Sequence, residues 1–304
     1  MEQTLKQTQK IQTIAIWGAC HKVEHIESIV GLFRELDSCG VTLFIEEEFF
    51  CFISQELSPK GSRSPLTGVQ LIKPGSVVPS VDIAICIGGD GTFLRTVHRL
   101  ASLKVPIWAV NCGRLGFLMD VDARDSAAYV PQLLQGNFRI EERSMIQIVM
   151  NRKVVGVALN ELAIQKRETG SLIQVKVALD DVPLADYAAD GLIISTPTGS
   201  TAYSLSLGGP IVSPGCEAVV LTPIAPHSLN IRPFVIPNNQ KIALSVSSRS
   251  ASFAVVIDGV MQVLPCGTPI EIVKAQDKAQ LIRLVDKPFT HTLRDKMMWG
   301  QDLR

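Results

Sequence analysis

The first 110 residues of the chain alternate short apolar runs with segments of helical periodicity. In residues 26–36 the apolar side chains Ile26, Ile29, Val30, Phe33 and Leu36 recur every three or four positions, which places them on one face of a helix. The apolar runs have the length of buried strands, and they occupy residues 11–17, 41–45, 81–87 and 105–110. Strands that alternate with helices in this way predict a parallel sheet covered by helices, an N-terminal Rossmann-like α/β domain.

The pattern changes after residue 138, where the segments shorten and helical periodicity becomes scarce. Short apolar or alternating segments occupy residues 143–150, 154–159, 172–179, 191–195, 241–246, 253–257 and 269–272. They predict a β-rich, sandwich-like second domain, so that the fold class is α/β plus all-β. We expect the α/β domain over residues 1–125 and the β-rich domain over residues 126–285. Residues 54–80 are rich in Pro, Gly, Ser and Lys, which predicts a mobile loop or irregular connection.

Composition changes this picture little. The chain has 304 residues, of which 46% are hydrophobic, enough for two cores. Lys plus Arg and Asp plus Glu number 29 each, so no attraction to polyanions is expected and nucleic acid is not an expected partner. Residues 1–6 are polar and no apolar run approaches the ~20 residues of a membrane span, so we expect no signal peptide, no membrane association and a cytoplasmic location. Seven cysteines without Cys-x-x-Cys spacing predict reduced thiols rather than disulfides or a zinc site.

The first candidate chemistry is the sequence Ile-Gly-Gly-Asp-Gly-Thr at residues 87–92. It follows an apolar run and precedes a helical pattern, which predicts a strand, a glycine turn and a helix. Glycine N–H groups beside a helix N-terminus can hold phosphate or ribose oxygens. Asp90 brings a carboxylate into this anion-binding loop, which is unusual unless the carboxylate faces a hydroxyl or a metal. The alternative is an Asp-Gly turn in which Asp90 only caps the helix.

In a second stretch, residues 190–206, small and hydroxylated residues follow a short strand with β-branched residues. Its seven Ser or Thr hydroxyls beside glycines predict a hydrogen-bonding lip that approaches a polar ligand, and Tyr203 can stack on a ring. Asn160 and Glu161, in a mainly apolar segment, carry donors and acceptors suited to adenosine edges and ribose hydroxyls. Taken alone, the hydroxyl-rich stretch is also explained as a solvated turn, and Asn160-Glu161 as a surface turn.

Together these motifs resemble the NAD kinase family over nearly the whole chain. Residues 88–92, 111–118, 160–161, 190–206 and 226–229 fall where the family carries similar runs. Diacylglycerol, sphingosine and phosphofructokinase relatives share the Gly-Gly-Asp-Gly core, but the Thr-Pro-Thr-Gly-Ser-Thr-Ala-Tyr element points to the NAD kinase branch. The resemblance implies transfer of the terminal phosphoryl group of ATP, another triphosphate or polyphosphate to the 2′-hydroxyl of the adenosine ribose of NAD, giving NADP.

The resemblance also implies roles for single residues. Asp90 is the expected catalytic base, which accepts the proton of the ribose hydroxyl as the bond to phosphorus forms. Mg²⁺ or another divalent cation is expected on the triphosphate, without protein ligands of its own. The residues expected to bind phosphate are Gly88, Gly89, Gly91, Thr92 and Arg95, although Arg95 is equally explained as a solvated helix residue. The residues expected to bind NAD are Asp90, Gly91, Asn160, Glu161, Ala188, Asp190, Thr201, Ala202, Tyr203, Ser204, Leu205, Ser206 and Ala225.

Three further positions depart from the family or invite another interpretation, and the first two bear on the expected nicotinamide end. Asp258-Gly259 between apolar runs predicts a two-residue hairpin turn, followed by Val260 where the family often has a polar residue. Ala188 stands where many members carry a basic residue, so we expect altered discrimination between NAD and NADH. His227 is expected to be a buried, hydrogen-bonded histidine that orders a loop rather than a catalytic group.

The resemblance further implies a homodimer or homotetramer, with residues 286–304 packing back on the first domain. Two other classes of protein explain less of the sequence. A non-catalytic dinucleotide sensor has no need of Asp90 in a phosphate loop, and a lipid or sugar kinase leaves the hydroxyl-rich motif unexplained. A nicotinamide dehydrogenase is disfavoured because residues 88–91 lack the Gly-x-Gly-x-x-Gly spacing.

Overall fold

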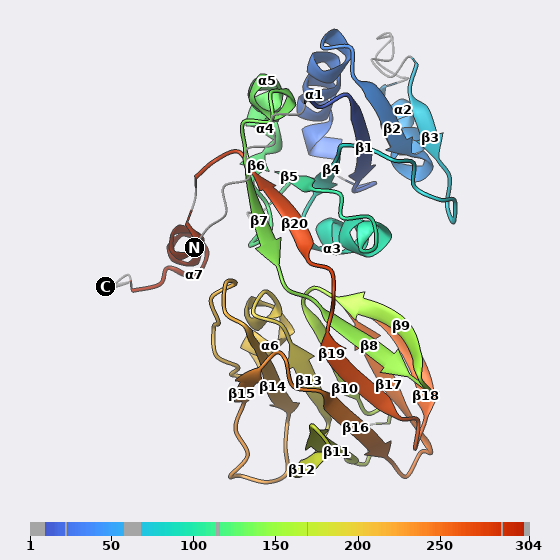
Figure 1. Ribbon diagram of the computed structural model, residues 1–304, viewed down its shortest axis with the longest axis vertical. Helices are drawn as coiled ribbons and strands as arrows, with labels where there is room; N and C mark the ends of the chain where they lie inside the picture. The colour runs from blue at the N-terminus through green and yellow to red at the C-terminus, as the bar shows by residue number, and fades with distance from the viewer. Residues whose placement is uncertain are drawn as a thin grey trace. The chain divides into compact units, whose positions relative to one another are not determined.

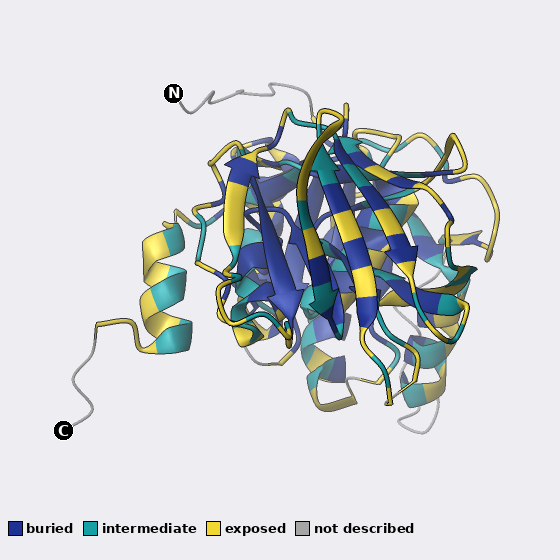
Figure 2. Ribbon diagram, turned by 90° about the horizontal axis from the view of Figure 1, so that it is seen from below, coloured by how far each residue is buried: buried dark blue, intermediate teal, exposed yellow. Residues whose placement is uncertain are grey.

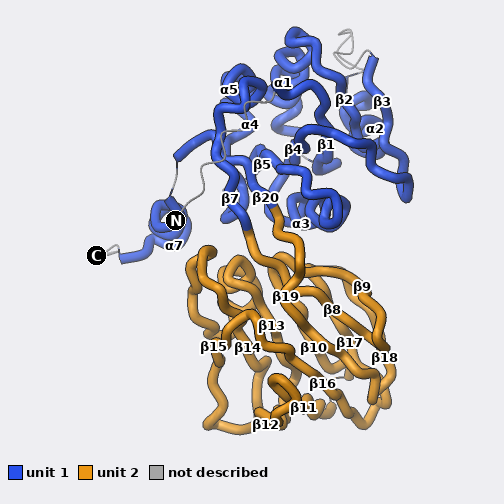
Figure 3. Tube along the Cα trace, viewed as in Figure 1, with its two compact units in different colours: residues 1–142, 280–304 blue, residues 143–279 orange. Residues whose placement is uncertain are grey.

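The chain forms two compact units, shown in Figure 3 in blue and orange. The computed structural model describes residues 10–21, 23–57, 68–113, 116–168, 170–286 and 288–300. Unit 1 comprises Met1–Glu142 and Gln280–Arg304, and unit 2 comprises Arg143–Ala279. Figure 1 labels the helices and strands of both units in chain order.

Unit 1 is built on a largely parallel sheet whose strands follow the order β3-β2-β1-β4-β5-β20-β7, with β6 beside β5. The pairs β3-β2, β2-β1, β1-β4, β4-β5 and β5-β20 are parallel. The order around β1, in which the chain moves outward to β3 and then crosses to β4 and β5, is that of a Rossmann-like fold. The strands are β1 (Thr13–Gly18), β2 (Thr42–Glu46), β3 (Gln70–Ile72), β4 (Ile83–Gly88), β5 (Ile107–Asn111), β6 (Val121–Asp122), β7 (Arg139–Arg143) and β20 (Ala279–Arg283).

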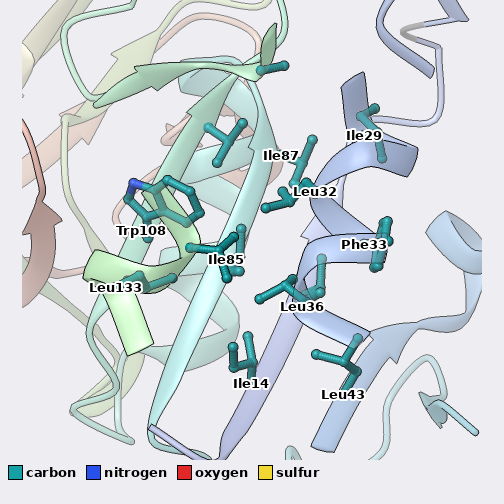
Figure 4. Packing of buried hydrophobic residues seen from close by; sticks show 14 of the residues in the cluster. Ile14, Ile29, Leu32, Phe33, Leu36, Leu43, Ile85, Ile87, Trp108 and Leu133 are labelled. Carbon is teal, nitrogen blue, oxygen red and sulfur yellow. The ribbon is translucent and has the colours of Figure 1, made fainter. Parts of the chain in front are cut away.

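The helix predicted from the periodicity of residues 26–36 is α1, and it packs against this sheet. Figure 4 shows Leu32 and Leu36 of α1 facing Ile87 and Ile85 of β4, with Trp108 in the same cluster. These side chains are fully or almost fully buried, which is why the strands are apolar at nearly every position rather than at alternate ones. The helices of unit 1 are α1 (Ile26–Ser38), α2 (Glu47–Leu57), α3 (Asp90–Leu100), α4 (Ala123–Ser126), α5 (Val130–Leu134) and α7 (Phe289–Met297).

The two units divide at residues 142/143 and 279/280, not at the expected 125/126 and 285/286. Helix α5 contributes Val130, Leu133 and Leu134 to the core of unit 1, and β7 and β20 extend its sheet. The prediction of a loop over residues 54–80 was wrong at two places, its start and residues 70–72. Residues 54–57 complete helix α2, whose buried Ile53 and Leu57 join the core, and residues 70–72 form β3. Residues 58–67 lie outside the described ranges.

Unit 2 consists of two sheets of antiparallel strands, in the orders β15-β14-β13-β10-β17-β18 and β12-β11-β16-β19-β8-β9 within the described residues. Ile173, Val175 and Val177 of β11 alternate with exposed residues, and Figure 2 shows this striping on the strands of a sheet. The inward side chains of both sheets form one core, so the predicted sandwich-like fold is confirmed. The elements are β8 (Ile146–Met150), β9 (Lys153–Ala158), β10 (Glu161–Gln165), β11 (Ile173–Leu179), β12 (Val182–Ala189), β13 (Gly191–Ser195), α6 (Tyr203–Ser206), β14 (Ala218–Ile224), β15 (Phe234–Pro237), β16 (Ile242–Ser247), β17 (Ser252–Ile257), β18 (Val260–Pro265) and β19 (Ile270–Lys274).

Two further expectations concern the chain as a whole. No disulfide links cysteines in the described part of the chain. Within the same ranges, none of the helices has the length and apolar character needed to cross a membrane.

Candidate active site

In unit 1, the glycine-aspartate motif joins β4 directly to α3. Gly88 ends the strand, Gly89 is the N-cap residue of the helix, and Asp90 is its first helical residue. The N–H groups of Thr92 and Phe93 donate to the carbonyl of Gly89 at 2.9 and 3.0 Å, which closes the first turn. A Cβ atom at Gly88 would lie 2.6 Å from Oγ1 of Thr92, so the motif has no room for a side chain there. The predicted strand, glycine turn and helix are present.

The carboxylate of Asp90 does not cap its own helix but points to a distant turn. Its Oδ2 accepts the N–H of Phe117 at 3.0 Å, and its Oδ1 accepts the N–H of Leu118 at 3.3 Å. A Cβ atom on Gly116 would lie 1.8 Å from Oδ1, so this carboxylate position requires glycine at residue 116. The helix-cap interpretation of Asp90 is therefore wrong, because the side chain fastens residues 116–118 to the motif.

The segment that holds Asp90 is itself anchored by residues of the sheet. Arg283 on β20 donates to the carbonyls of Leu118 and Met119 at 3.1 and 3.2 Å, and its Nε lies 2.6 Å from the carboxylate of Glu141. At the end of β5, Asn111 donates to the carbonyl of Gly113 at 2.8 Å, while its Oδ1 is buried without a partner. Sequence reasoning missed Arg283, since 165 residues separate it from Leu118 and only the sheet order brings them together.

The other residues expected to bind phosphate differ in exposure. The sites of Gly89 and Gly91 border open space, since added Cβ atoms would meet nothing within 4 Å. Thr92 is buried and its hydroxyl accepts from Nη2 of Arg95 at 3.5 Å. Arg95 itself is exposed, one turn into α3. The arrangement presents backbone, a carboxylate and one guanidinium at the start of a helix, where anions are stabilised.

In unit 2, Asn160 and Glu161 are held by a second carboxylate. Asp258 accepts the N–H groups of Leu159, Asn160 and Glu161 at 2.7, 2.9 and 2.9 Å. Asp258 and Gly259 have φ angles of +43° and +88° and connect β17 to β18, as the predicted two-residue hairpin turn requires. The turn therefore does more than reverse the chain, because its first residue fixes the backbone of the Asn-Glu pair.

The carboxyl group of Glu161, which neighbours that of Asp258, has a shifted pKa. Its Oε2 atom is buried without a hydrogen-bond partner in the structure. Burial, and secondarily the negative charge of Asp258, raises the pKa of Glu161 to about 8. A buried acceptor without a donor destabilises the protein, so this oxygen is suited to a ligand group that brings one, such as a hydroxyl.

The hydroxyl-rich segment is not the open lip that the sequence predicted. Ser195, Thr196, Thr198, Ser200 and Ser204 are buried. Most of these hydroxyls bind within the protein: that of Thr196 donates to the carbonyl of Leu159 at 2.5 Å, and those of Ser204 and Thr222 lie 2.7 Å apart. The segment approaches Asn160 so closely that a Cβ atom on Gly199 would lie 2.1 Å from its carbonyl oxygen. Its hydroxyls therefore support the backbone around Asn160 and Glu161 from inside the protein.

Other residues expected to bind NAD, in and after this segment, are partly or fully exposed. Tyr203, the first residue of α6, is 38% exposed, and Ser206 at the end of the same helix is also exposed. Thr201, Ala202 and Leu205 are half-buried. Ala225 is exposed with a φ of +43°, an unusual conformation for alanine.

Asp190, between β12 and β13, pairs with a lysine that the sequence did not single out. Nζ of Lys166 lies 2.5 Å from Oδ1 of Asp190, and the N–H of Lys166 donates to the carbonyl of Asp190 at 2.9 Å. The pairing follows from the antiparallel register of β10 and β13, in which Gln165 faces Gly191. A cation thus stands beside Asp190 even though residue 188 is an alanine.

The prediction for His227 was wrong in one respect. The residue is exposed rather than buried, and its backbone N–H donates to the carbonyl of Ala188 at 2.8 Å. The backbone of the loop, rather than the imidazole, makes this contact with β12.

Unit 1 is Rossmann-like and carries a glycine-aspartate loop. Unit 2 is a β-sandwich with a buried carboxyl oxygen, Oε2 of Glu161, that has no hydrogen-bond partner in the structure. Together these features indicate a nucleotide-dependent phosphotransferase. Comparison with known proteins gives the particular family. Residues 76–138 match the ATP-NAD kinase N-terminal domain, and residues 159–284 match the ATP-NAD kinase C-terminal domain. The chain belongs to the NAD kinase family. The sensor and the lipid or sugar kinase are therefore not supported.

Individual relatives agree with this family over almost their full length. The chain is 46% identical to an NAD kinase of Porphyromonas gingivalis, covering 97% of this chain and 100% of that one. It is 39% identical to an NAD kinase of Bacteroides fragilis, covering 95% and 99%. Among solved structures, yeast NADH kinase complexed with NADH has the same fold with a TM-score of 0.85, at 23% identity and covering 97% of this chain and 90% of that one. An NAD kinase from Archaeoglobus fulgidus in complex with ATP gives a TM-score of 0.69, at 23% identity and covering 94% and 99%.

Proposed function

We propose that the chain transfers the terminal phosphoryl group of ATP to the 2′-hydroxyl of the adenosine ribose of NAD, with Asp90 as the base. The observation that carries this assignment is the carboxylate of Asp90, held by two backbone N–H groups at the N-terminus of α3. Each carboxylate oxygen accepts one of these bonds, and a carboxylate has about four acceptor sites, so it retains capacity for a hydroxyl proton. A ribose hydroxyl is a weak nucleophile at neutral pH and requires such an acceptor.

The phosphate groups are assigned to the same loop. The backbone around Gly88, Gly89, Gly91 and Thr92 would bind phosphate oxygens, and the exposed Arg95 would reach them from the next turn of the helix. Among the described residues, no three His, Cys, Asp or Glu side chains form a group that could hold a metal ion. The divalent cation, Mg²⁺ in this proposal, is assigned to the triphosphate substrate because phosphate oxygens are the ligands it prefers.

The dinucleotide is assigned to unit 2. The buried Oε2 of Glu161 would accept a ribose hydroxyl, and Asn160, whose backbone Asp258 fixes, would bind beside it. Tyr203 would stack on a ring through its exposed face. Thr201, Ala202, Leu205, Ser206 and Ala225 would line the pocket, whereas Ser204, whose hydroxyl pairs with Thr222, would contribute backbone only.

Asp190 and Ala188 are assigned to the nicotinamide end. The ion pair with Lys166 offsets the charge of Asp190, so the oxidised, positively charged ring gains little from this carboxylate. We therefore propose that the enzyme phosphorylates NADH measurably as well as NAD. A comparison of kcat/KM for the two substrates tests this finer assignment.

Three further proposals concern the whole protein. It would act as a homodimer or homotetramer, which is supported by the exposed apolar side chains of Val260, Met261 and Val263 on the edge strand β18, at 59, 67 and 51%. It would work in the cytoplasm, where its substrates are found. Polyphosphate would serve as an alternative donor, because a backbone cradle recognises phosphate charge rather than a base.

The direct experiment incubates the pure protein with NAD and Mg²⁺ and with either ATP or polyphosphate, and measures NADP. We expect NADP formation with ATP in a one-to-one ratio with ADP, and loss of the reaction when EDTA removes the cation. ATP hydrolysis without NADP formation would contradict the proposed function, whereas activity with ATP alone would contradict only the donor assignment.

A further inference from the structure

The C-terminal helix α7 contacts the turn that holds Asp90. The rings of Phe289, at the start of α7, and Phe117 have centroids 6.1 Å apart and planes inclined by 44°. Near the end of the helix, Nζ of Lys296 lies 4.3 Å from the centroid of the same Phe117 ring. Phe289 and Lys296 are seven residues apart, about two helical turns, so they lie on one face of α7. The backbone N–H of Phe117 is one of the two donors to Asp90.

A lysine is not what packing alone would select at this contact. Figure 2 shows α7 as half-buried and exposed along its length, and Lys296 is one of its half-buried residues. Burial lowers the pKa of the Lys296 ammonium, while the neighbouring charge of Asp90 raises it. An apolar side chain would cover Phe117 without this desolvation. The lysine therefore indicates a function for the charge.

The ammonium group also has unused hydrogen-bonding capacity. It has three N–H donors, and the ring of Phe117 is its described contact. Within the described ranges, no carboxylate forms an ion pair with it. A partly desolvated cation beside the catalytic carboxylate, with donors free, is suited to an anionic ligand.

We propose that Lys296 binds the phosphoryl group that is transferred to NAD. The inference rests on the proposed function and adds a phosphate ligand from the C-terminal helix. In the reaction, the bond between the ribose oxygen and phosphorus forms, the bond between phosphorus and the ADP oxygen breaks, and the hydroxyl proton passes to Asp90. Lys296 neither gains nor loses a proton. Its charge stabilises the phosphoryl oxygens and reduces their repulsion with the Asp90 carboxylate.

The competing explanation is that Lys296 only fastens α7 to Phe117. Lys296→Met keeps an unbranched side chain on the ring and removes the charge, whereas Lys296→Arg keeps both the charge and the cation–π contact. Arg294→Met is the matched control, since Arg294 is an exposed cation on the same helix. The readouts are kcat and KM for ATP, the affinity for NAD, the binding of the magnesium complex of a non-hydrolysable ATP analogue, and the thermal midpoint.

We expect Lys296→Met to lower kcat/KM for ATP by at least ~10-fold and to weaken analogue binding, with NAD affinity and thermal midpoint unchanged. Lys296→Arg should restore most of the loss, and Arg294→Met should behave as the wild type. A Lys296→Met variant as active as the wild type would overturn the role of Lys296 and leave the proposed function standing. Equal losses in both Lys296 variants with a lowered thermal midpoint would show a structural role instead. A wild-type protein that binds the analogue but makes no NADP would contradict the proposed function itself.

Discussion

Asp90 in unit 1 and Asp258 in unit 2 use the same contact for different purposes. Both carboxylates accept backbone N–H groups from distant segments, Asp90 from two residues 27 and 28 positions away and Asp258 from three residues 97 to 99 positions away. Asp258 lies in a hairpin turn beside another carboxyl group, that of Glu161. Asp90 begins a helix and has the cation of Lys296 nearby. In the proposed function, the first arrangement shapes the dinucleotide site around Asn160 and Glu161, and the second leaves a carboxylate available for proton transfer.

The comparison teaches that an Asp-Gly sequence does not define a role. Both aspartates precede a glycine, at Gly91 and Gly259, and for each the sequence allows a simple turn. What separates them is which groups occupy their acceptor sites and which charges lie around them.

The largest effect is expected from Gly116→Ala. The new Cβ atom would lie 1.8 Å from Oδ1 of Asp90, so the carboxylate must move from its two donors. A misplaced base should lower turnover by at least ~10²-fold, while NAD affinity, assigned to unit 2, stays within a few-fold. Gly31→Ala is the control, because a Cβ atom at Gly31 meets nothing within 4 Å in helix α1. Steady-state kinetics measures the turnover, and calorimetry measures the NAD affinity. Full turnover in Gly116→Ala would show that catalysis does not require this position of the carboxylate.

Asp258→Ala should destabilise the protein rather than act on turnover directly. It leaves the N–H groups of Leu159, Asn160 and Glu161 without their acceptor and places alanine at a φ of +43°. We expect the free energy of unfolding to fall by about 3 kcal/mol in denaturant titrations. Asp258→Asn keeps one acceptor oxygen and a residue that tolerates this φ, so it should lose about half as much. Unchanged stability in both variants would contradict the framing role.

Glu161 predicts a pH dependence of stability. Its pKa is about 8 in the folded protein and close to ~4.3 in the unfolded chain, so the folded state binds more protons between these values. The stability it contributes is full below about pH 4 and is lost as the pH rises toward 8. Without NAD, Glu161→Gln should exceed the wild type in unfolding free energy by on the order of 2 kcal/mol at pH 8, and by less at pH 5. Glu271→Gln, at an exposed position, is the control, and parallel pH profiles for wild type and Glu161→Gln would refute the assignment.

The smallest effect is expected at Tyr203. Tyr203→Ala removes a stacking surface that is already 38% exposed, so NAD binding should weaken by about 1 kcal/mol, roughly fivefold in Kd. Tyr203→Phe keeps the ring and should bind as the wild type does. An equal loss in both variants would assign the interaction to the hydroxyl rather than to stacking.

The local pattern of apolar residues was sufficient to predict the strands that are buried in the core. The strands β4 and β5 are buried along their whole length, and β1 is buried at every residue after its first, so their apolar runs stood out. Strand β12 is exposed at half of its residues, and β14 contains Pro223, so neither had a clear alternation of apolar and polar residues. For the site, the motifs indicated Asp90 and Glu161, but not the contacts that define their roles. Lys166 with Asp190 and Lys296 with Phe117 are pairs that form only through strand register and helix docking, which no local spacing encodes.

The most direct test measures turnover and unfolding free energy on the same preparations of Asp90→Asn and Asp258→Asn. If Asp90 is the base, Asp90→Asn lowers the rate of NADP formation by at least ~10²-fold and changes unfolding free energy by less than ~1 kcal/mol. Asp258→Asn lowers unfolding free energy by about 1.5 kcal/mol and, at saturating NAD, changes turnover by less than ~10-fold. An Asp90→Asn variant that forms NADP at near the wild-type rate, or that loses activity only in proportion to lost folded protein, would contradict the account.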